Sequence, residues 1–371
     1  MDNSLDFSHA EVRRAAAYHR ALYLALAADF ALGAGVLAAV AWTWAGRRLF
    51  GAVAELPPVG AAAAYAALVV TVSSVVRLPL ALWRGWLRER RWGFSTQGLA
   101  GWLGDRAKGL VLSAALASGA WGAAVALARA LPGWWAAPAA GGLALAVLLL
   151  SFVAPVVLEP VFNRFARLED EELAGALRAL ADRAGVPVRE VLVADASRRT
   201  TKVNAYVSGL GRTRRVVLFD TLLEAAARPE VALVVAHELA HRRERHVAKL
   251  TLLGMAGAAA AVVLLWAVLG SRVGAPRELP VVLLVLLAYE LAGMPAGAAL
   301  SRRWERVADR CSLDLTEDPE AFRTAHLELA RRNLADLEPP RLAYLVLFSH
   351  PTPPDRLALG RAWAAARSGA T

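Results

Sequence analysis

Six long apolar runs dominate the pattern of hydrophobic and polar positions along the chain. An α-helix needs roughly 20 predominantly apolar residues to cross the hydrocarbon core of a bilayer, and each run is about that long. The runs lie near residues 21–44, 60–83, 109–131, 136–158, 250–270 and 279–300. The pattern therefore predicts an α-helical multispanning membrane protein.

The polar region at 159–249 has a different pattern. The segment EDEELAGALRALADRAG has helical spacing and begins with acidic residues, whereas EVLVAD, KVNAYVSG and RRVVLFD are short strand-like runs bounded by turns. A further helical stretch, TLLEAAARPEVALVVAHELAHRRERH, has Pro229 at a position suited to a first helical turn. We expect a small α/β unit with one helix, then a small sheet, then this second helix.

Composition and charge agree with a membrane protein. Of the 371 residues 57% are hydrophobic, and the mean hydropathy is +0.42. The net charge is +10, but most Lys and Arg flank the apolar runs, so membrane topology explains the charge better than nucleic acid binding does. We therefore expect the lipid bilayer as a partner and no nucleic acid. The single cysteine, Cys311, excludes an intrachain disulfide and a cysteine-rich zinc site.

The basic residues are distributed unevenly between the ends of the runs. They cluster before the first run and between the second and third runs, whereas Arg129 alone separates the third from the fourth. The positive-inside rule then predicts that both termini face the cytosol. The N-terminal run is about twice as long as the apolar part of a signal peptide and has no clear cleavage site, so we expect a retained first span.

These expectations divide the chain into four parts. They are a membrane domain with four spans at 1–158, a cytosolic core that contains the candidate metal helix at 159–249, two further spans at 250–300, and a C-terminal cytosolic part at 301–371.

The stretch VVAHELAHRRERH contains two histidines four residues apart, with a glutamate directly after the first. On a helix, His237 and His241 share one face and can bind one ion, while Glu238 points beside it. Zinc suits this set, because three protein ligands leave a position for a water whose pKa falls to roughly 7 and whose proton Glu238 can accept. The alternative is a chance HExxH on a polar helix, since the pattern fixes only three positions.

A candidate third ligand follows the sixth run, in the segment SRRWERVADRCSLDL. Glu305 and Asp309 are four residues apart and share a helix face, so Glu305 can complete a His, His, Glu site. Asp309 can then accept the remaining ring N–H of a histidine ligand. The alternative is a solvated helix in which Glu305 pairs with Arg302, Arg303 or Arg306. Both segments lie at cytosolic ends of expected spans, which favours the metal site.

His350, in the segment FSHPTPPDR, is a candidate for the catalytic step. Near the metal it could donate a hydrogen bond to the oxyanion that forms when water attacks a peptide carbonyl. A lone histidine before a proline is more often a loop residue, so both interpretations stay open.

With HELAH, ERVAD and SHP in this order, the sequence resembles the integral-membrane zinc CaaX prenyl proteases of the type I family, in the gluzincin group. The segment RRWGFSTQGLAGWLGDRAKG at 90–109 is similar to that family's loop between early spans. EPVFNRF at 159–165 is similar to its entry to the soluble domain, and NAYVSGLGRTRRVVLFDTLL at 204–223 to its strand pair before the zinc helix. The resemblance covers most of residues 84–356.

The resemblance implies a role for each candidate residue. The implied roles are ligands of one zinc ion for His237, His241 and Glu305, general base and acid for Glu238, support of a ligand for Asp309, and stabilisation of the tetrahedral intermediate for His350. Asn204, Ala205 and Tyr206 would form the edge strand along which an extended substrate pairs through its main chain, the alternative being an ordinary edge strand. Arg356 would orient the substrate or the site, or simply pair with an acid.

The chain departs from the family pattern at two points. The family often has an aromatic residue after the second zinc histidine, where this chain has Arg242, although His246 keeps its place. Family members have seven spans around a large water-filled chamber, whereas six apolar runs are visible here. We therefore expect six to seven spans, and the resemblance implies a chamber between them.

Three ionisable residues lie in or at the edges of the apolar runs, namely Asp29, Arg77 and Glu290. Such groups are costly in a bilayer unless they face water or one another. They would line a cavity or pair between helices. The alternative for Asp29 and Arg77 is that their side chains snorkel to the membrane surface, or that the span ends at a different residue from the one predicted.

Together these features predict a CaaX-protease-like zinc endopeptidase that hydrolyses a peptide or membrane-protein substrate. The alternatives are a quality-control protease of the heat-shock type and a catalytically inactive membrane scaffold or transporter. An intact Glu238 argues against inactivity, because an inactive descendant has no chemical reason to keep the base. Composition rich in Ala and Arg suggests a bacterium, which would place the active site on the cytosolic side of a bacterial membrane.

Overall fold

The computed structural model describes residues 6–154, 157, 159–208 and 214–369. Six helices in this part of the chain are long and apolar enough to span a membrane. They correspond one for one to the predicted runs and occupy His9–Trp42, Pro58–Arg91, Leu99–Ala130, Ala136–Val153, His246–Gly274 and Pro276–Thr316. The prediction of a multispanning helical protein is therefore confirmed. Residues 155, 156 and 158 of the fourth predicted run and 209–213 of the predicted strand pair lie outside the described residues.

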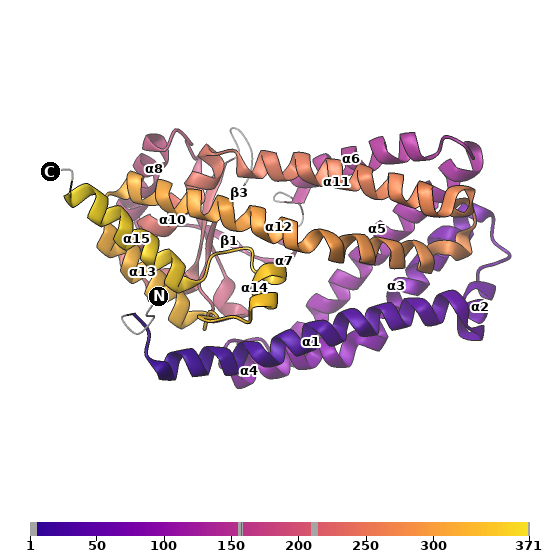
Figure 1. The fold of residues 1–371 in the computed structure, drawn as a ribbon, viewed down its shortest axis with the longest axis horizontal. Helices are drawn as coiled ribbons and strands as arrows, with labels where there is room; N and C mark the ends of the chain where they lie inside the picture. The colour runs from indigo at the N-terminus through magenta and orange to yellow at the C-terminus, as the bar shows by residue number, and fades with distance from the viewer. Residues whose placement is uncertain (1–5, 155–156, 158, 209–213, 370–371) are drawn as a thin grey trace.

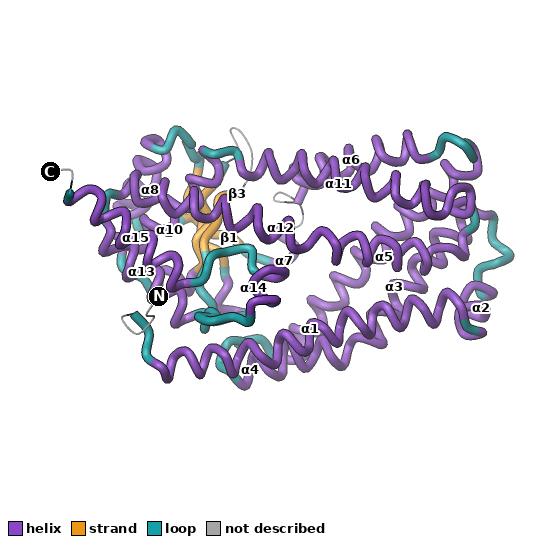
Figure 2. The backbone as a smooth tube through the Cα atoms, viewed as in Figure 1, coloured by secondary structure: helices purple, strands orange, loops and turns teal. Residues whose placement is uncertain are grey.

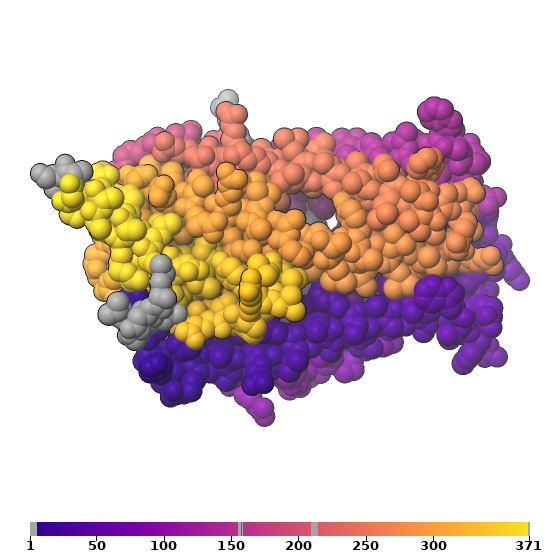
Figure 3. Space-filling model, in the orientation of Figure 1, coloured from indigo at the N-terminus to yellow at the C-terminus, as the bar shows by residue number. Residues whose placement is uncertain are grey.

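The long helices run side by side along the longest axis of the molecule (Figure 1). The main ones are α1 (His9–Trp42), α3 (Pro58–Leu82), α5 (Leu99–Ala130), α6 (Ala136–Val153), α11 (His246–Leu269) and α12 (Leu279–Thr316). The shorter pieces among them are α2 (Trp44–Gly51), the π-helical turn η2 (Trp83–Leu87), α4 (Arg88–Arg91), α7 (Glu159–Phe162), and the 3₁₀ turns η6 (Gly270–Gly274) and η7 (Pro276–Glu278). The surface has an opening midway along the molecule, beside the orange segments (Figure 3). The chamber itself stays a prediction.

Helix α1 begins well before the apolar run that predicted it. Ser8 caps it, since its hydroxyl accepts from the amide of Glu11 while the Glu11 carboxylate accepts from the amide of Ser8. The helix has 34 residues and is therefore about 51 Å long, against about 30 Å for a hydrocarbon core. The polar residues at 9–20 do not stop the helix. Its first turns pack against the C-terminal part of the chain, where Tyr18 shares an apolar cluster with Leu327 and Leu357.

The soluble part contains a four-stranded sheet, which lies at one end of the molecule (Figure 2). Its order is β1-β2-β4-β3, with strands at Phe165–Arg167, Glu190–Ala194, Arg215–Phe219 and Ala205–Ser208 in that order. The β2 and β4 strands are parallel, and the other two pairs are antiparallel. Strand β1 precedes the first helix of this region and was not predicted, because its three residues are too few to show alternation.

Helices α8 (Glu171–Arg183) and α10 (Arg228–Arg243) pack with the sheet around one apolar core. Leu177 from α8 and Val235 and Leu239 from α10 are each 0% exposed in this core. Pro229 lies in the first turn of α10, as predicted. The other elements of the soluble part are η4 (Ala196–Arg198), α9 (Asp220–Ala225), α13 (Pro319–Arg332), α14 (Arg341–Leu347) and α15 (Pro353–Ser368).

The ionisable residues of the apolar runs have different surroundings. Arg77 on α3 donates to Asp29 on α1 through two nitrogens, over 2.9 Å and 2.6 Å. Arg84 lies 3.9 Å from the same carboxylate. Asp29 and Arg77 therefore pair between helices, which is one of the alternatives that the sequence left open. Glu290 lies on an exposed face of α12.

Candidate metal centre

Helices α10 and α12 pack together and bring the three expected ligands to one point. The Nε2 atoms of His237 and His241 lie 3.1 Å apart. Glu305 reaches them from α12, with one oxygen 3.2 Å from Nε2 of His237 and the other 3.3 Å from Nε2 of His241. The ligand atoms of the three residues all lie within 4.8 Å of one another. The two histidines of α10 and the distant carboxylate of Glu305 therefore lie together, as the sequence predicts.

These donor atoms fit a single cation. His237 directs Nδ1 at an Asp309 oxygen 2.9 Å away, so Nδ1 carries the proton and Nε2 presents a lone pair to the Glu305 carboxylate. Two acceptors at 3.2 Å repel each other unless a positive charge lies between them. The buried Oε2 of Glu305 has no hydrogen-bond partner in the described part of the chain. Bonds of about 2.0–2.2 Å to a tetrahedral ion would separate its ligands by about 3.3 Å, close to the separations found.

Electrostatics at the site also favour a positive charge. Burial disfavours the imidazolium form of His237, but the adjacent carboxylates of Asp309 and Glu305 outweigh it and raise the pKa of His237 to about 9. Without an ion, a proton would supply the charge that the carboxylates require.

Asp309 accepts a hydrogen bond from His237 and forms an ion pair with an arginine. Its side chain is 0% exposed, and it accepts from Nε of Arg356 on α15 over 2.8 Å and from the Nη2 atom of the same guanidinium. Arg356 therefore pairs with an acid, which is one of the alternatives that the sequence left open. The guanidinium approaches Nδ1 of His237 to 3.3 Å, so the three side chains form one buried cluster.

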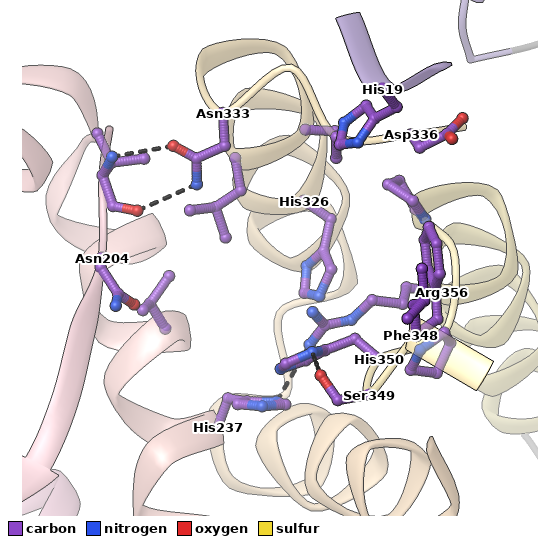
Figure 4. Close-up of a pocket in the computed structure, with 18 of the residues that line it drawn as sticks. His19, Asn204, His237, His326, Asn333, Asp336, Phe348, Ser349, His350 and Arg356 are labelled. Atoms are coloured by element: carbon purple, nitrogen blue, oxygen red, sulfur yellow. Dashed lines mark hydrogen bonds between the residues drawn. The ribbon is translucent and has the colours of Figure 1, made fainter. Parts of the chain in front are cut away.

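Glu238 faces a cavity of about 680 Å³ beside the expected ligands. The cavity is bounded by α1, α10, α13 and the loop that carries His350, and Figure 4 shows the side chains that project into it. Burial raises the pKa of the Glu238 carboxyl. Leu22, Leu26 and Arg84 also line the cavity, so it extends from the ligands towards the membrane helices.

His350 enters the cavity from the loop between α14 and α15. Its Nε2 lies 3.5 Å from Glu305, and its Nδ1 lies 2.7 Å from the hydroxyl of Ser349. The side chain lines the cavity and is 58% exposed. Partial desolvation by its neighbours lowers the pKa of His350.

The expected substrate strand reaches the cavity at one residue. Asn204 lines the cavity, whereas Ala205 is buried in β3. Tyr206 does not line it, and its hydroxyl donates to Glu159 over 3.2 Å. The structure therefore brings Asn204, but not the Tyr206 side chain, to the candidate site.

Two further histidines, to which no role was assigned from the sequence, lie close to the site. The left-handed Arg245, with a φ of 56°, turns the chain between α10 and α11. This turn places Nδ1 of His246 3.0 Å from Nδ1 of His241, with the His246 ring stacked on Trp304. His246 can therefore orient His241 as Asp309 orients His237.

His326 on α13 is the second of these histidines, and it is buried. Its ring stacks on Phe322, and its Nε2 lies 3.7 Å from Asp309. Helical spacing from Phe322 marks His326 as a core residue, but no local signal indicates the approach to Asp309.

Comparisons with known proteins agree with this geometry. Residues 167–364 match the model of peptidase family M48, and residues 11–164 match the model described as CAAX prenyl protease N-terminal, five membrane helices. The uncharacterized metalloprotease YhfN of Bacillus subtilis is 31% identical over 57% of this chain and 52% of its own length. CAAX prenyl protease 1 of Saccharomyces cerevisiae is 32% identical over 50% of this chain and 41% of its own length.

The fold is also similar to a solved structure. The crystal structure of S. mikatae Ste24p superposes with a TM-score of 0.74 at 24% identity, over 84% of this chain and 79% of that one. The chain thus spans about half, or less, of the two curated relatives, and most of the solved structure. Because a family model covers more than half of its residues, the chain belongs to peptidase family M48.

Proposed function

We propose that this protein is an integral-membrane zinc endopeptidase. The observation that carries the proposal is the convergence of His237, His241 and Glu305 on one point, with a buried Glu305 oxygen that lacks a hydrogen bond. Glu238 faces the adjoining cavity, which is large enough for several residues of an extended peptide. A zinc ion held by the three ligands would lower the pKa of a water molecule to about 7 and polarise a peptide carbonyl.

Glu238 is the general base and acid in this proposal. Its carboxylate takes the proton of the attacking water and passes it to the nitrogen of the leaving amine. Burial raises its pKa, and a raised pKa suits a group that must both accept and return a proton near neutral pH.

His350 stabilises the negative oxygen that develops on the attacked carbonyl. The Ser349 hydroxyl can donate to Nδ1 of His350, which leaves the ring proton on Nε2, the atom nearer Glu305. A neutral ring with its N–H on that side is a donor for the oxyanion.

Asp309 and Arg356 position His237 and do not contact the substrate in this proposal. Asp309 keeps the proton on Nδ1 of His237, so that Nε2 is free to bind the ion. Arg356 compensates the charge of Asp309, which would otherwise be buried alone.

The substrate is a peptide or membrane protein that lies along β3 in extended form, beginning at Asn204. The relatives named as CAAX prenyl proteases support a CaaX-like substrate class. The positive-inside distribution supports a cytosolic active site, carried by the parts at 159–249 and 301–371, with spans at 1–158 and 250–300. A bacterial cytoplasmic membrane fits the Ala- and Arg-rich composition.

Replacing Glu238 by Gln tests the function. The protein, purified in lipid nanodiscs and loaded with zinc, is incubated with β-casein, and its products are counted by mass spectrometry. We expect Glu238→Gln to lower the cleavage rate by about 10²–10⁴-fold while one zinc per chain is kept, because only the proton transfer is lost.

Glu244→Gln is the matched control, since Glu244 lies at the end of the same helix and outside the cavity lining. This control should cleave at the unaltered rate. Cleavage by Glu238→Gln at that same rate would contradict the proposed mechanism.

A further inference from the structure

The open side of β3 is defined by the order of the sheet. Strand β3 is last in the order β1-β2-β4-β3, so among the described residues one side of its main chain faces no strand. The amide of Phe219 donates to the carbonyl of Asn204, which fixes the alternation of the antiparallel pair. Asn204 and every second residue after it direct their main-chain groups towards β4. The residues that direct theirs to the open side are Val203, Ala205 and Val207.

Side chains of this chain already occupy one end of the open side. The carboxamide of Asn333, at the end of α13, accepts from the amide of Val203 over 3.0 Å and donates to its carbonyl over 3.1 Å. Both bonds are drawn in Figure 4. The carboxamide therefore takes the place of a neighbouring strand, and no peptide can pair with Val203 while it stays there.

Arg242 occupies the other end. Its Nη2 donates to the carbonyl of Val207 over 2.5 Å. Between the two ends, the amide of Ala205 donates to the side chain of Asn204 over 2.9 Å. The groups left without a hydrogen bond among the described residues are the carbonyl of Ala205 and the amide of Val207.

Burial follows the same division. Asn204 is exposed and lines the cavity, whereas Ala205 is 2% exposed and Val207 is 7% exposed. Arg242 directly follows the ligand His241 on α10, so its side chain crosses from the candidate metal helix to the edge strand. The cavity is therefore open to β3 at Asn204 and does not extend to Val207.

We infer that Arg242 is a specificity-determining residue that shortens the docking edge. Its guanidinium occupies the Val207 carbonyl, which a longer substrate strand would use as an acceptor. The substrate main chain therefore forms hydrogen bonds with β3 at Ala205 but not at Val207. This inference rests on the proposed function, because it assumes that an extended substrate pairs with β3.

A backbone-methylation scan tests the inference. A fluorogenic decapeptide whose cleavage depends on Glu238 is selected from a library, and each of its N–H groups is methylated in turn. The carbonyls of Ala205 and Val207 would pair with substrate N–H groups two residues apart, whichever way the peptide runs. In the unaltered protein, methylation at the position that faces Val207 should leave kcat/KM unchanged.

Arg242→Gln frees the Val207 carbonyl, because the glutamine carboxamide ends two atoms short of the Nη2 that donates to it. We expect one additional sensitive position, two residues from one that is already sensitive, and a KM about fivefold lower for the unmethylated peptide with unchanged kcat. Arg242→Lys, which can still donate to Val207, should restore the original scan. Arg243→Gln is the matched control, because this neighbouring arginine is exposed and contacts Cys311 instead.

The outcomes separate this inference from the proposed function. Glu238-dependent cleavage with the same sensitive positions in Arg242→Gln and the unaltered protein would overturn the role of Arg242 alone. If no library peptide is cleaved in a Glu238-dependent way, the proposed function fails and the inference fails with it. If Arg242→Gln does not fold, Arg242→Met, which keeps the aliphatic packing, gives the same comparison.

Discussion

Asp309 is the residue whose replacement most directly tests how the candidate metal centre is built. Its carboxylate is 0% exposed and accepts from Nδ1 of His237 and from two nitrogens of Arg356. Asp309→Asn keeps the shape but removes the negative charge. His237 then faces a neutral carboxamide, whose single oxygen is a weaker acceptor for its Nδ1–H than a carboxylate is, and Arg356 loses the charge that compensates it.

Two magnitudes follow from these contacts. Loss of an outer hydrogen-bond partner of a metal-binding histidine weakens metal affinity about 10–100-fold, which is about 1.4–2.7 kcal/mol. Removal of one partner of a buried ion pair costs about 3–5 kcal/mol of stability, and the side chain of Arg356 is 16% exposed, so it lies close to this buried limit. We therefore expect Asp309→Asn both to bind zinc more weakly and to unfold at a lower temperature.

The two effects can be separated by a second substitution. Zinc affinity is measured by competition with a chromophoric chelator, and unfolding is followed by tryptophan fluorescence in nanodiscs. Adding Arg356→Met to Asp309→Asn removes the unpaired guanidinium and should recover part of the stability, while zinc affinity stays low because His237 still faces a neutral carboxamide and not a carboxylate. Zinc affinity of Asp309→Asn within twofold of the unaltered protein would refute this account, as would its full recovery in the double variant.

The remaining predictions concern pH and the membrane helices. Burial raises the pKa of Glu238 above its ordinary value of 4.5, and the base must be ionised to act, so kcat/KM should fall as the pH drops through that raised pKa. An acidic limb at or below pH 4.5 would contradict this. Asp29→Asn leaves Arg77 without its partner in an apolar span, which should cost about 2.5–3.5 kcal/mol and lower the unfolding temperature. The exchanged pair Asp29→Arg with Arg77→Asp should recover part of the loss, and an unchanged unfolding temperature in Asp29→Asn would show that the pair is not needed.

The features that the sequence predicts well are those with local signals. Apolar length alone identifies six spans, and a spacing of four residues places His237 and His241 on one helix face. Glu305 is far along the chain from both histidines, yet it is found because it too lies at the end of a span and has a carboxylate four residues later. Family resemblance adds roles to these positions, and the structure adds the distances.

The features that the sequence does not predict depend on tertiary packing. His326 and Asn333 lie on or after α13, and only the docking of that helix brings them to Asp309 and Val203. Strand β1 is too short to show a period. Arg242 is recognised in the sequence as a departure from a family pattern, but its bond to the edge strand requires that α10 lie against β3.

One continuous helix, α12, carries both a membrane span and the third expected ligand. Pro295 lies inside it, and Glu305 follows ten residues later, about 15 Å along the axis at 1.5 Å per residue. A change of about 5° in the inclination of this segment would swing the carboxylate by about 1.3 Å, several times the roughly 0.2 Å tolerance of a zinc bond. In the proposed zinc site, the thickness of the surrounding lipid would therefore change the position of Glu305 relative to the two histidines, and the cleavage rate should vary with acyl-chain length.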